Sequence, residues 1–335
     1  MSIITITYNH ERYINQCIQS IKDQSFTDWE LIVVDDKSTD KTRELISMHE
    51  DRRIRIFEGL GTGPKGIPDN YNLALKIADS ELVAILEGDD FWPSYKLEKQ
   101  VQYHHRLPST ILTYGDYGVT NPNGNLIYTA RPARSLKPEI RNNNPVGSMA
   151  FQMLLSGGTI YTFPCTVMIK RESLEAIGGF QKINEVPLTD FPTVFKLATI
   201  GPFGYVPEKL GFWRRHYGSV TYGYDAQVLQ NIFTHCLGVY SHDTLLRSFE
   251  INDRLIKRRW AWSIAMKHVT RGRIGLLRRQ WDIAEKEFRN ALHMTDSFII
   301  MILARIGIIA SSLHFNLEGL ARIMRGHDLR DFLGG

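Results

Sequence analysis

The sequence has few cysteines, and their positions suit neither a zinc site nor a set of disulfides. Cys17, Cys165 and Cys236 lie far apart in the 335 residues, and no CxxC spacing occurs. A thiolate zinc site and a disulfide framework are therefore excluded, and a reducing compartment is expected. Because Met1–His10 has no basic segment before its apolar run, we expect no signal peptide and a cytoplasmic location.

Long apolar runs are also missing. The best candidate, Phe298–Ala310, is short and has Arg305 near its middle, so it falls below the length and purity of a membrane-spanning helix. A surface-lying or re-entrant segment stays open. The composition, 43% hydrophobic and 23% charged, excludes a disordered chain and a collagen-like fibre, and the length indicates about two domains.

Charge is distributed unevenly along the chain. Residues 251–335 hold 15 Lys and Arg against 8 Asp and Glu, a net charge of +7. The whole chain carries +4, so residues 1–250 carry about −3. A basic tail on a mildly acidic body indicates two separate roles, and anionic lipid or nucleic acid are both candidate partners of the tail.

The first 115 residues alternate between short β-rich runs and helical spacing. The predicted strands are 3–6, 29–34, 54–57 and 82–86, with apolar residues at helical intervals between them. Strand–helix–strand alternation with short links predicts a mostly parallel α/β sheet flanked by helices. From about residue 225 onward the pattern is helical, so we divide the chain into 1–222 and 223–335.

The middle of the chain has a looser pattern. Thr110–Tyr114 and Cys165–Ile169 are predicted strands, and Asn123 with Gly124 predicts the tight turn of a hairpin. The stretch 131–148 is rich in Pro, Arg and Asn and is predicted to be a loop.

Acidic clusters follow two of the predicted strands directly. Asp35 and Asp36 come after one buried run, and Glu87–Asp90 comes after another. In an open α/β sheet, ligands bind outside the carboxyl ends of the strands. Paired carboxylates repel each other unless a cation neutralises them, and Mg²⁺ is typically held by one or two carboxylates plus substrate phosphates. The alternative, that Asp36 and Asp90 only cap turns or helices, explains one such cluster better than two.

Four segments resemble family 2 glycosyltransferases in order and spacing. The segments are Thr7–His10, Trp29–Asp40, Tyr71–Leu75 and Glu87–Asp90. The resemblance covers roughly residues 2–221 and implies a GT-A fold, which is Rossmann-like and binds a nucleotide diphosphate-sugar across the carboxyl edge of its sheet. A helical C-terminal region would follow.

The resemblance also implies roles for individual residues. Thr7 and Tyr8 would line the nucleoside pocket, Asp36 would contact the base, and Asp89 the ribose. Asp90 would bind Mn²⁺ or Mg²⁺ that bridges the diphosphate.

Asn9 and Asn72 belong to the matching segments and are expected near the nucleotide-sugar. This chain departs from the family in having Tyr71 where Arg is common before the asparagine. We expect Lys65 to supply the missing positive charge.

A general base is needed for inverting transfer, on the face opposite the departing diphosphate. The stretch Gly178–Phe180 followed by Glu185–Thr193 resembles the acceptor loop of the family, and this resemblance makes Asp190 the base. Thr189 stands where the family commonly has a first acid. Asp190 lies two residues before Pro192, so it would also serve as the N-cap of a helix, and the two roles are compatible.

The segment Phe212–Thr221 resembles the R-x-H-x-x-S/T segment that closes over the diphosphate in the family. His216 is expected to contact the metal or a phosphate. Arg214 and Arg215 cannot be told apart from the sequence, and we assign the diphosphate contact to Arg215.

A competing motif is present in Gly61–Gly66, which satisfies G-x-G-x-x-G and would favour a nucleotide-binding oxidoreductase. Its context argues against that function. Pro64 and Pro68 interrupt the helix start, and the motif does not follow the first strand. A loop beside the donor is the better interpretation.

The tail mixes cations with aromatic residues. Cations beside tryptophans suit a helix lying on an anionic bilayer, whereas a solvated basic bundle or a homo-oligomer interface explains the same pattern. Nucleic-acid binding is disfavoured because no recognised motif accompanies the charge. The tryptophans are Trp260, Trp262 and Trp281, and the cations are Arg254, Lys257, Arg258, Arg259, Lys267, Arg271, Arg273, Arg278 and Arg279.

The sequence therefore predicts a metal-dependent inverting transferase for a hexosyl or N-acetylhexosaminyl group. The resemblance makes a UDP-sugar the expected donor, and a cell-surface polysaccharide or lipid-linked glycan the expected acceptor. The location would be cytoplasmic, or peripheral on the inner face of the membrane. The alternative from another class is a non-catalytic nucleotide-sugar-binding or scaffold protein on the same fold.

Overall fold

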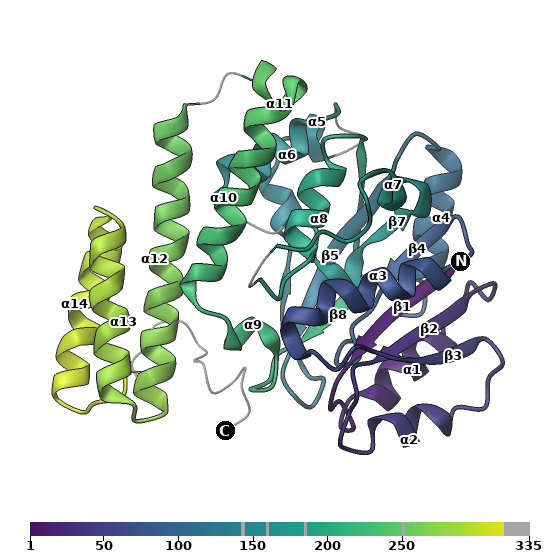
Figure 1. Cartoon of the computed structure of the whole chain (residues 1–335), viewed down its shortest axis with the longest axis horizontal. Coiled ribbons are helices and arrows are strands. Elements are labelled where there is room, and N and C mark those ends of the chain that lie inside the picture. Colours follow the sequence, from purple (N-terminus) through teal and green to yellow (C-terminus); the bar gives the residue numbers. More distant parts are fainter. Residues whose placement is uncertain (142–144, 159–160, 184–185, 250–251, 318–335) are drawn as a thin grey trace.

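The computed structural model describes residues 1–317 except 142–144, 159–160, 184–185 and 250–251. It contains one mixed sheet of eight strands, with the strand order β3-β2-β1-β4-β7-β5-β6 and β8 paired to β5. Helices cover the sheet, and the last helices of the described chain form a separate group beside it (Figure 1).

The parallel half of the sheet contains the first four strands. They are β1 (Ser2–Thr7), β2 (Glu30–Asp35), β3 (Ile54–Glu58) and β4 (Leu82–Ile85). Thr7 pairs with Asp35, and Asp35 pairs with Glu58, so the carboxyl ends of the three strands meet at one edge. The predicted parallel arrangement is present.

Helices pack on both faces of this half, because its strands have apolar residues on both faces that must be covered. Even-numbered residues of β1 and β2, such as Ile4 and Ile32, join one hydrophobic core, while Ile3 and Leu31 join another. The helices between the strands are α1 (Ile14–Lys22), α2 (Thr42–Ser47), η1 (Gly63–Gly66), α3 (Ile67–Ile77) and α4 (Lys96–Arg106).

The second half of the sheet is mixed. It contains β5 (Leu112–Thr120), β6 (Leu126–Ala130), β7 (Met168–Lys170) and β8 (Phe203–Arg214). β7 is antiparallel to β4 and β5, and β8 runs parallel to β5. The predicted hairpin turn joins β5 and β6, with Gly124 at a φ of 81° that favours glycine.

Short helices fill the connections of the second half. They are η2 (Pro132–Ser135), α5 (Pro138–Arg141), α6 (Ser148–Leu155), η3 (Pro164–Thr166), α7 (Arg171–Ala176) and α8 (Asp190–Leu197). The predicted loop 131–148 is therefore wrong in part, because proline at the first helical position starts a turn of helix that needs no apolar periodicity. The predicted strand at Cys165–Ile169 begins three residues later, after η3.

The C-terminal region is helical, as predicted. Its helices are α9 (Val220–Gly223), α10 (Ala226–His242), α11 (Thr244–Ser248), α12 (Asp253–Leu277), α13 (Trp281–Met294) and α14 (Phe298–Ser312). Asp225, Asp243 and Asn252 cap three of them, each accepting a backbone N–H three residues on. Among the described helices, none combines the length and the apolar character that crossing a membrane requires.

Two hydrophobic cores meet inside α12. Trp260 is 1% exposed and belongs to the main core of the sheet, and its indole N–H donates to the carbonyl of Leu154 in α6 at 2.9 Å. Ala265 and Val269, five and nine residues further on, belong to a smaller core shared with α13 and α14. The predicted boundary at residue 222 lies in α9, after the last strand has ended at Arg214, while the cores separate about 40 residues after the boundary.

Trp260→Ala should lower the free energy of unfolding of the whole chain by about 3–5 kcal/mol, because it leaves a cavity and an unpaired carbonyl in the main core. Denaturant unfolding measures this change. Trp262→Ala is the matched control, since Trp262 is on the same helix but 44% exposed, and it should change the stability by less than about 1 kcal/mol. Equal losses in the two variants would show that α12 does not close the main core.

Candidate active site

A cavity of about 380 Å³ opens at the carboxyl edge of the sheet. Segments after β1, β2 and β4 form one side, and segments from the second half of the sheet form the other. Its polar lining comprises Thr7, Tyr8, His10, Asp36, Asn70, Tyr71, Glu87, Asp89, Asp90, Thr162, Thr189, Asp190, Thr193, Ser219, Thr221 and Tyr224.

Asp36 organises the glycine-rich loop beside the cavity. Its carboxylate accepts the backbone N–H groups of Gly61 at 2.8 Å and Gly63 at 3.1 Å, and the side-chain amide of Asn70 at 2.8 Å. Gly63 and Pro64 then line the cavity, whereas the predicted cation, Lys65, is exposed on η1. The loop that satisfies G-x-G-x-x-G is therefore held by an acid.

The segment after β1 supplies the next wall. Thr7 is buried with its hydroxyl 3.1 Å from Nδ1 of His10, and Tyr8 lines the cavity while 48% exposed. Asn9 has a different position from the one expected. Its side-chain oxygen accepts the N–H of Thr39 at 2.8 Å, so it ties the loop after β1 to the loop after β2.

Asp89 lies between two histidines. Its carboxylate is 2.9 Å from Nε2 of His216 and 3.9 Å from Nε2 of His10. Burial raises the pKa of Asp89, but the two histidines outweigh burial and bring the pKa down to about 2. One ligand atom from each of the three residues lies within 4.8 Å of the others. Two imidazoles and a carboxylate in this spacing suit a divalent cation such as Mn²⁺.

Asp90 has another partner. It is 2% exposed, and one of its oxygens accepts the backbone N–H of Arg214 at 2.8 Å. Burial raises the pKa of Asp90, and the charges of Asp89 and Glu87 raise it further. Asp89, and not the predicted metal ligand Asp90, therefore belongs to the cluster with His10 and His216. Asp90 follows Asp89 in the chain and also lines the cavity.

Arg214 fastens this acidic segment to the second half of the sheet. Its guanidinium donates to the carbonyl of Asp89 at 2.7 Å, to the carbonyl of Pro122 at 2.9 Å and to the side chain of Gln16 at 2.5 Å. Arg214 is buried, whereas Arg215 has its guanidinium 5.2 Å from the ring of Trp213. The two arginines, equivalent in the sequence, therefore have different surroundings.

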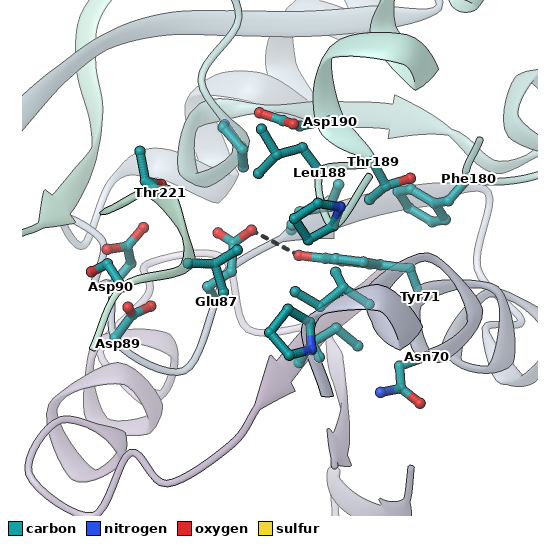
Figure 2. Close-up of a pocket in the computed structure, with 18 of the residues that line it drawn as sticks. Asn70, Tyr71, Glu87, Asp89, Asp90, Phe180, Leu188, Thr189, Asp190 and Thr221 are labelled. Atoms are coloured by element: carbon teal, nitrogen blue, oxygen red, sulfur yellow. Dashed lines mark hydrogen bonds between the residues drawn. The ribbon is translucent and has the colours of Figure 1, made fainter. Parts of the chain in front are cut away.

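Glu87 and Tyr71 form a partly buried polar pair. The hydroxyl of Tyr71 donates to Glu87 at 2.9 Å, the dashed contact in Figure 2. Burial, followed by repulsion from Asp89, raises the pKa of Glu87 to about 7. Tyr71, the residue that departs from the family pattern, therefore contacts an acid of the fourth segment. Its hydroxyl gives the carboxyl of Glu87 a hydrogen bond without adding a charge.

Asn72 holds the far wall of the cavity in place. Its side-chain amide donates to the carbonyl of Phe180 at 2.9 Å, and its oxygen accepts the N–H of Phe180 at 2.8 Å. Gly179 has a φ of 86°, and a Cβ there would lie 2.3 Å from the Asn72 oxygen. Phe180 lines the cavity, so Asn72 fixes this wall, and its contact with a ligand stays a prediction.

Asp190 lines the cavity across from the acidic segment, as Figure 2 shows. It is the first residue of α8, and Thr189 is the N-cap, so the predicted capping role of Asp190 is wrong by one position. The Thr189 hydroxyl instead donates to the carbonyl of Gln181 at 2.8 Å. Burial raises the pKa of Asp190, which makes its carboxylate a stronger base than an exposed aspartate.

The segment after β8 closes the remaining side. Gly218–Thr221 and Tyr224 line the cavity, as does Trp213 near the end of β8. This segment follows His216 directly, and the N–H of Ser219 donates to the carbonyl of His216 at 3.1 Å. The segment that was expected to cover a diphosphate is therefore part of the wall that also carries the histidine of the Asp89 cluster.

Several residues of the site were not predicted as functional. His10 and Tyr71 lie inside two of the segments that match the family, so their position in the sequence could have indicated that they belong to the site. Tyr224 and Trp213 carry no comparable signal.

Comparison with known proteins gives one family. The model of glycosyl transferase family 2 matches residues 2–178. The chain is 32% identical over 149 residues to the Escherichia coli UDP-Glc:α-D-GlcNAc-diphosphoundecaprenol β-1,3-glucosyltransferase WfgD, covering 44% of this chain and 58% of WfgD. The chain spans less than two thirds of the length of other similar curated proteins as well.

Two solved structures are similar along nearly the whole chain. Residues 1–349 of Staphylococcus aureus TarS in complex with UDP-GlcNAc give a TM-score of 0.60 at 17% identity, covering 98% of this chain and 93% of that one. The Pyrobaculum calidifontis mannosyltransferase PcManGT, in complex with GDP-Man and Mn²⁺, gives 0.55 at 18%, covering 97% and 87%. At these identities the likeness shows the fold alone, and it confirms the predicted GT-A fold with helices after it.

Replacing Asp89 or His216 should weaken Mn²⁺ binding, because each removes a ligand from the cluster with His10. We expect Asp89→Asn and His216→Ala each to raise the Kd for Mn²⁺, measured by calorimetry, by at least about tenfold. Asp51→Asn is the control, since Asp51 pairs with Arg53 at the opposite end of β3. If only Asp90→Asn lowered the affinity for Mn²⁺, Asp90 would be the ligand, as the sequence predicts.

Proposed function

The chain belongs to glycosyl transferase family 2, whose model matches more than half of its length, and from this membership we propose that it transfers a sugar from a nucleotide diphosphate-sugar to an acceptor hydroxyl with inversion. The observation that carries the proposal is the arrangement of one cavity. The Asp89 cluster lies on one side of it and Asp190 on another.

The donor would lie along the carboxyl edge of the sheet. Thr7, Tyr8 and the loop ordered by Asp36 would hold the nucleoside, which places the diphosphate near Asp89 and His216. A divalent cation held there by His10, Asp89 and His216, with Asp90 beside them, would neutralise the charge of the diphosphate. The glycine loop has a fixed shape because Asp36 satisfies two of its N–H groups.

Asp190 would act as the general base. The acceptor oxygen attacks the anomeric carbon of the sugar while its proton passes to the Asp190 carboxylate. The bond between the anomeric carbon and the diphosphate oxygen breaks, and its electron pair leaves with the diphosphate. Because attack and departure occur on opposite faces of the sugar, a single displacement inverts the configuration.

We propose a UDP-sugar as the donor and a membrane-linked glycan as the acceptor. The names of two relatives support this choice: TarS was solved with UDP-GlcNAc, and WfgD is named for UDP-Glc and a diphosphoundecaprenol-linked acceptor. The choice between a hexosyl and an N-acetylhexosaminyl group would then depend on the cavity wall around Phe180 and Leu188.

The region after residue 222 would bring the enzyme to the membrane that carries such an acceptor. α14 exposes apolar side chains at helical spacing, including Ile302 (42%), Ile306 (44%) and Ile309 (59%). Arg305 is exposed among them, and residues 251–335 carry a net charge of +7. Apolar residues with surrounding cations suit the surface of an anionic bilayer, so we propose a peripheral location on such a surface.

Asp190→Asn should lower kcat by about 10²- to 10⁴-fold, the usual contribution of a general base, in an assay of transfer from UDP-GlcNAc or UDP-Glc. Donor affinity in the presence of Mn²⁺, measured as the rise of Tm with ligand, should stay within about threefold of the unmodified chain.

Asp253→Asn is the control for the position of Asp190. Asp253 is likewise the first residue of a helix, but it is exposed on α12, and its replacement should leave kcat unchanged. Donor binding without transfer in the unmodified chain would favour the non-catalytic scaffold instead. Unaffected turnover in Asp190→Asn would remove the base assignment.

Flotation of the full chain with vesicles tests the membrane proposal. We expect binding to vesicles with about 30% phosphatidylglycerol and loss of that binding in Ile302→Glu/Ile309→Glu, because a charge on this face cannot enter the apolar layer. Ile200→Glu is the control, since Ile200 is 46% exposed and lies after α8. A double variant that still floats but changes the molar mass in light scattering would identify the face as a homo-oligomer contact and overturn the proposal.

A further inference from the structure

The segment that closes one side of the cavity is held from behind by α12. Lys267 donates from Nζ to the carbonyl of Thr221 at 3.0 Å, and the same nitrogen lies 3.4 Å from the centre of the Tyr224 ring. Arg271, one turn later, donates to the carbonyl of Tyr224 at 3.2 Å. Thr221 and Tyr224 both line the cavity, so two cations of the C-terminal region contact the cavity wall directly.

The one-turn helix α9 depends on these contacts. A helix of four residues, Val220–Gly223, leaves its carbonyl groups without partners of its own, and it presents the negative end of its dipole at its C-terminus. Lys267 donates to the carbonyl of Thr221 within α9, and Arg271 donates to the carbonyl of Tyr224, the residue that follows α9. Cations placed there satisfy the acceptors and interact favourably with the dipole.

Arg271 is itself held by α13, through Glu287. Glu287 accepts Nε of Arg271 at 2.8 Å and Nδ1 of His268 at 2.6 Å. Burial, followed by repulsion from Arg271, lowers the pKa of Lys267 to about 7, which is the mark of an amino group taken out of water. A position this unfavourable for a charge is explained by the contacts that the amino group makes with Thr221 and Tyr224.

The same face of α12 continues along the wall. Ile274 and Leu277 pack with Trp213 around Val119 of β5. Lys267, Arg271 and Ile274 follow one another at intervals of four and three residues, so they lie along one stripe of the helix. This stripe therefore packs near Trp213 and contacts Thr221 and Tyr224, at the two ends of the segment that contains His216.

We propose that Lys267 and Arg271 are positioning residues, which hold the segment 216–224 in the conformation that binds the diphosphate of the donor. The proposal rests on the proposed function. It assigns to the C-terminal helices a role in donor affinity that is separate from any contact with a membrane.

Lys267→Met tests the proposal, since methionine keeps the length of the side chain and removes its donor and charge. We expect the KM for the UDP-sugar to rise at least about tenfold while kcat stays within about threefold. Lys267→Arg should restore most of the affinity, because arginine can reach a carbonyl and lie against a ring. Lys257→Met, an exposed lysine on the same helix, should leave both constants unchanged.

Hydrogen exchange gives a second measurement that needs no turnover. The amides of residues 220–224 should exchange faster in Lys267→Met than in Lys257→Met, in the absence of nucleotide. If the unmodified chain transfers no sugar, the proposed function fails, and the exchange rates alone then decide the positioning role. Unchanged exchange and an unchanged KM would overturn it, as would a loss of affinity that Lys267→Arg does not restore and that accompanies a lower Tm of the whole chain.

Discussion

The structure depends on how it accommodates several carboxylates at one edge of a sheet. Glu87, Asp89 and Asp90 lie within four residues, and each loses solvent on folding, so their negative charges would repel one another strongly in the interior. Three different devices offset this repulsion: histidines beside Asp89, the backbone and guanidinium of Arg214 beside Asp90, and partial protonation of Glu87. The divalent cation that we propose for the cavity would complete this neutralisation.

Local pattern predicted the parallel half of the sheet and the acidic ends of its strands, because both are encoded within a few consecutive residues. The fold class and the family resemblance are confirmed by the comparisons. The partner of each polar side chain could not be predicted, because that partner is far away in the sequence. Arg214 meets Asp90 across 124 residues, and Asn72 meets Phe180 across 108. The same limit applies to Asn9, whose segment matches the family while its side chain contacts Thr39.

The C-terminal helices were predicted as helices because their apolar spacing is regular. Their relation to the sheet was not predictable, because α12 belongs to two cores and the switch occurs between Trp260 and Ala265 without any change in helical pattern. Contacts of Lys267 with the cavity wall were equally hidden, since a lysine in a basic stretch is more often solvated. A helix assigned to a separate region thus contributes to the main core and to the wall of the active site.

The position of β8 late in the sequence determines when Arg214 becomes available during synthesis of the chain. The four parallel strands end at residue 85, but the strand that carries Arg214 is synthesised much later. At ordinary rates of translation, the 124 residues between Asp90 and Arg214 take roughly 6 to 25 seconds to appear. During that interval the nascent chain holds its acidic edge without the arginine that later anchors it. The contacts between Asp90 and Arg214 therefore cannot form until β8 has been synthesised.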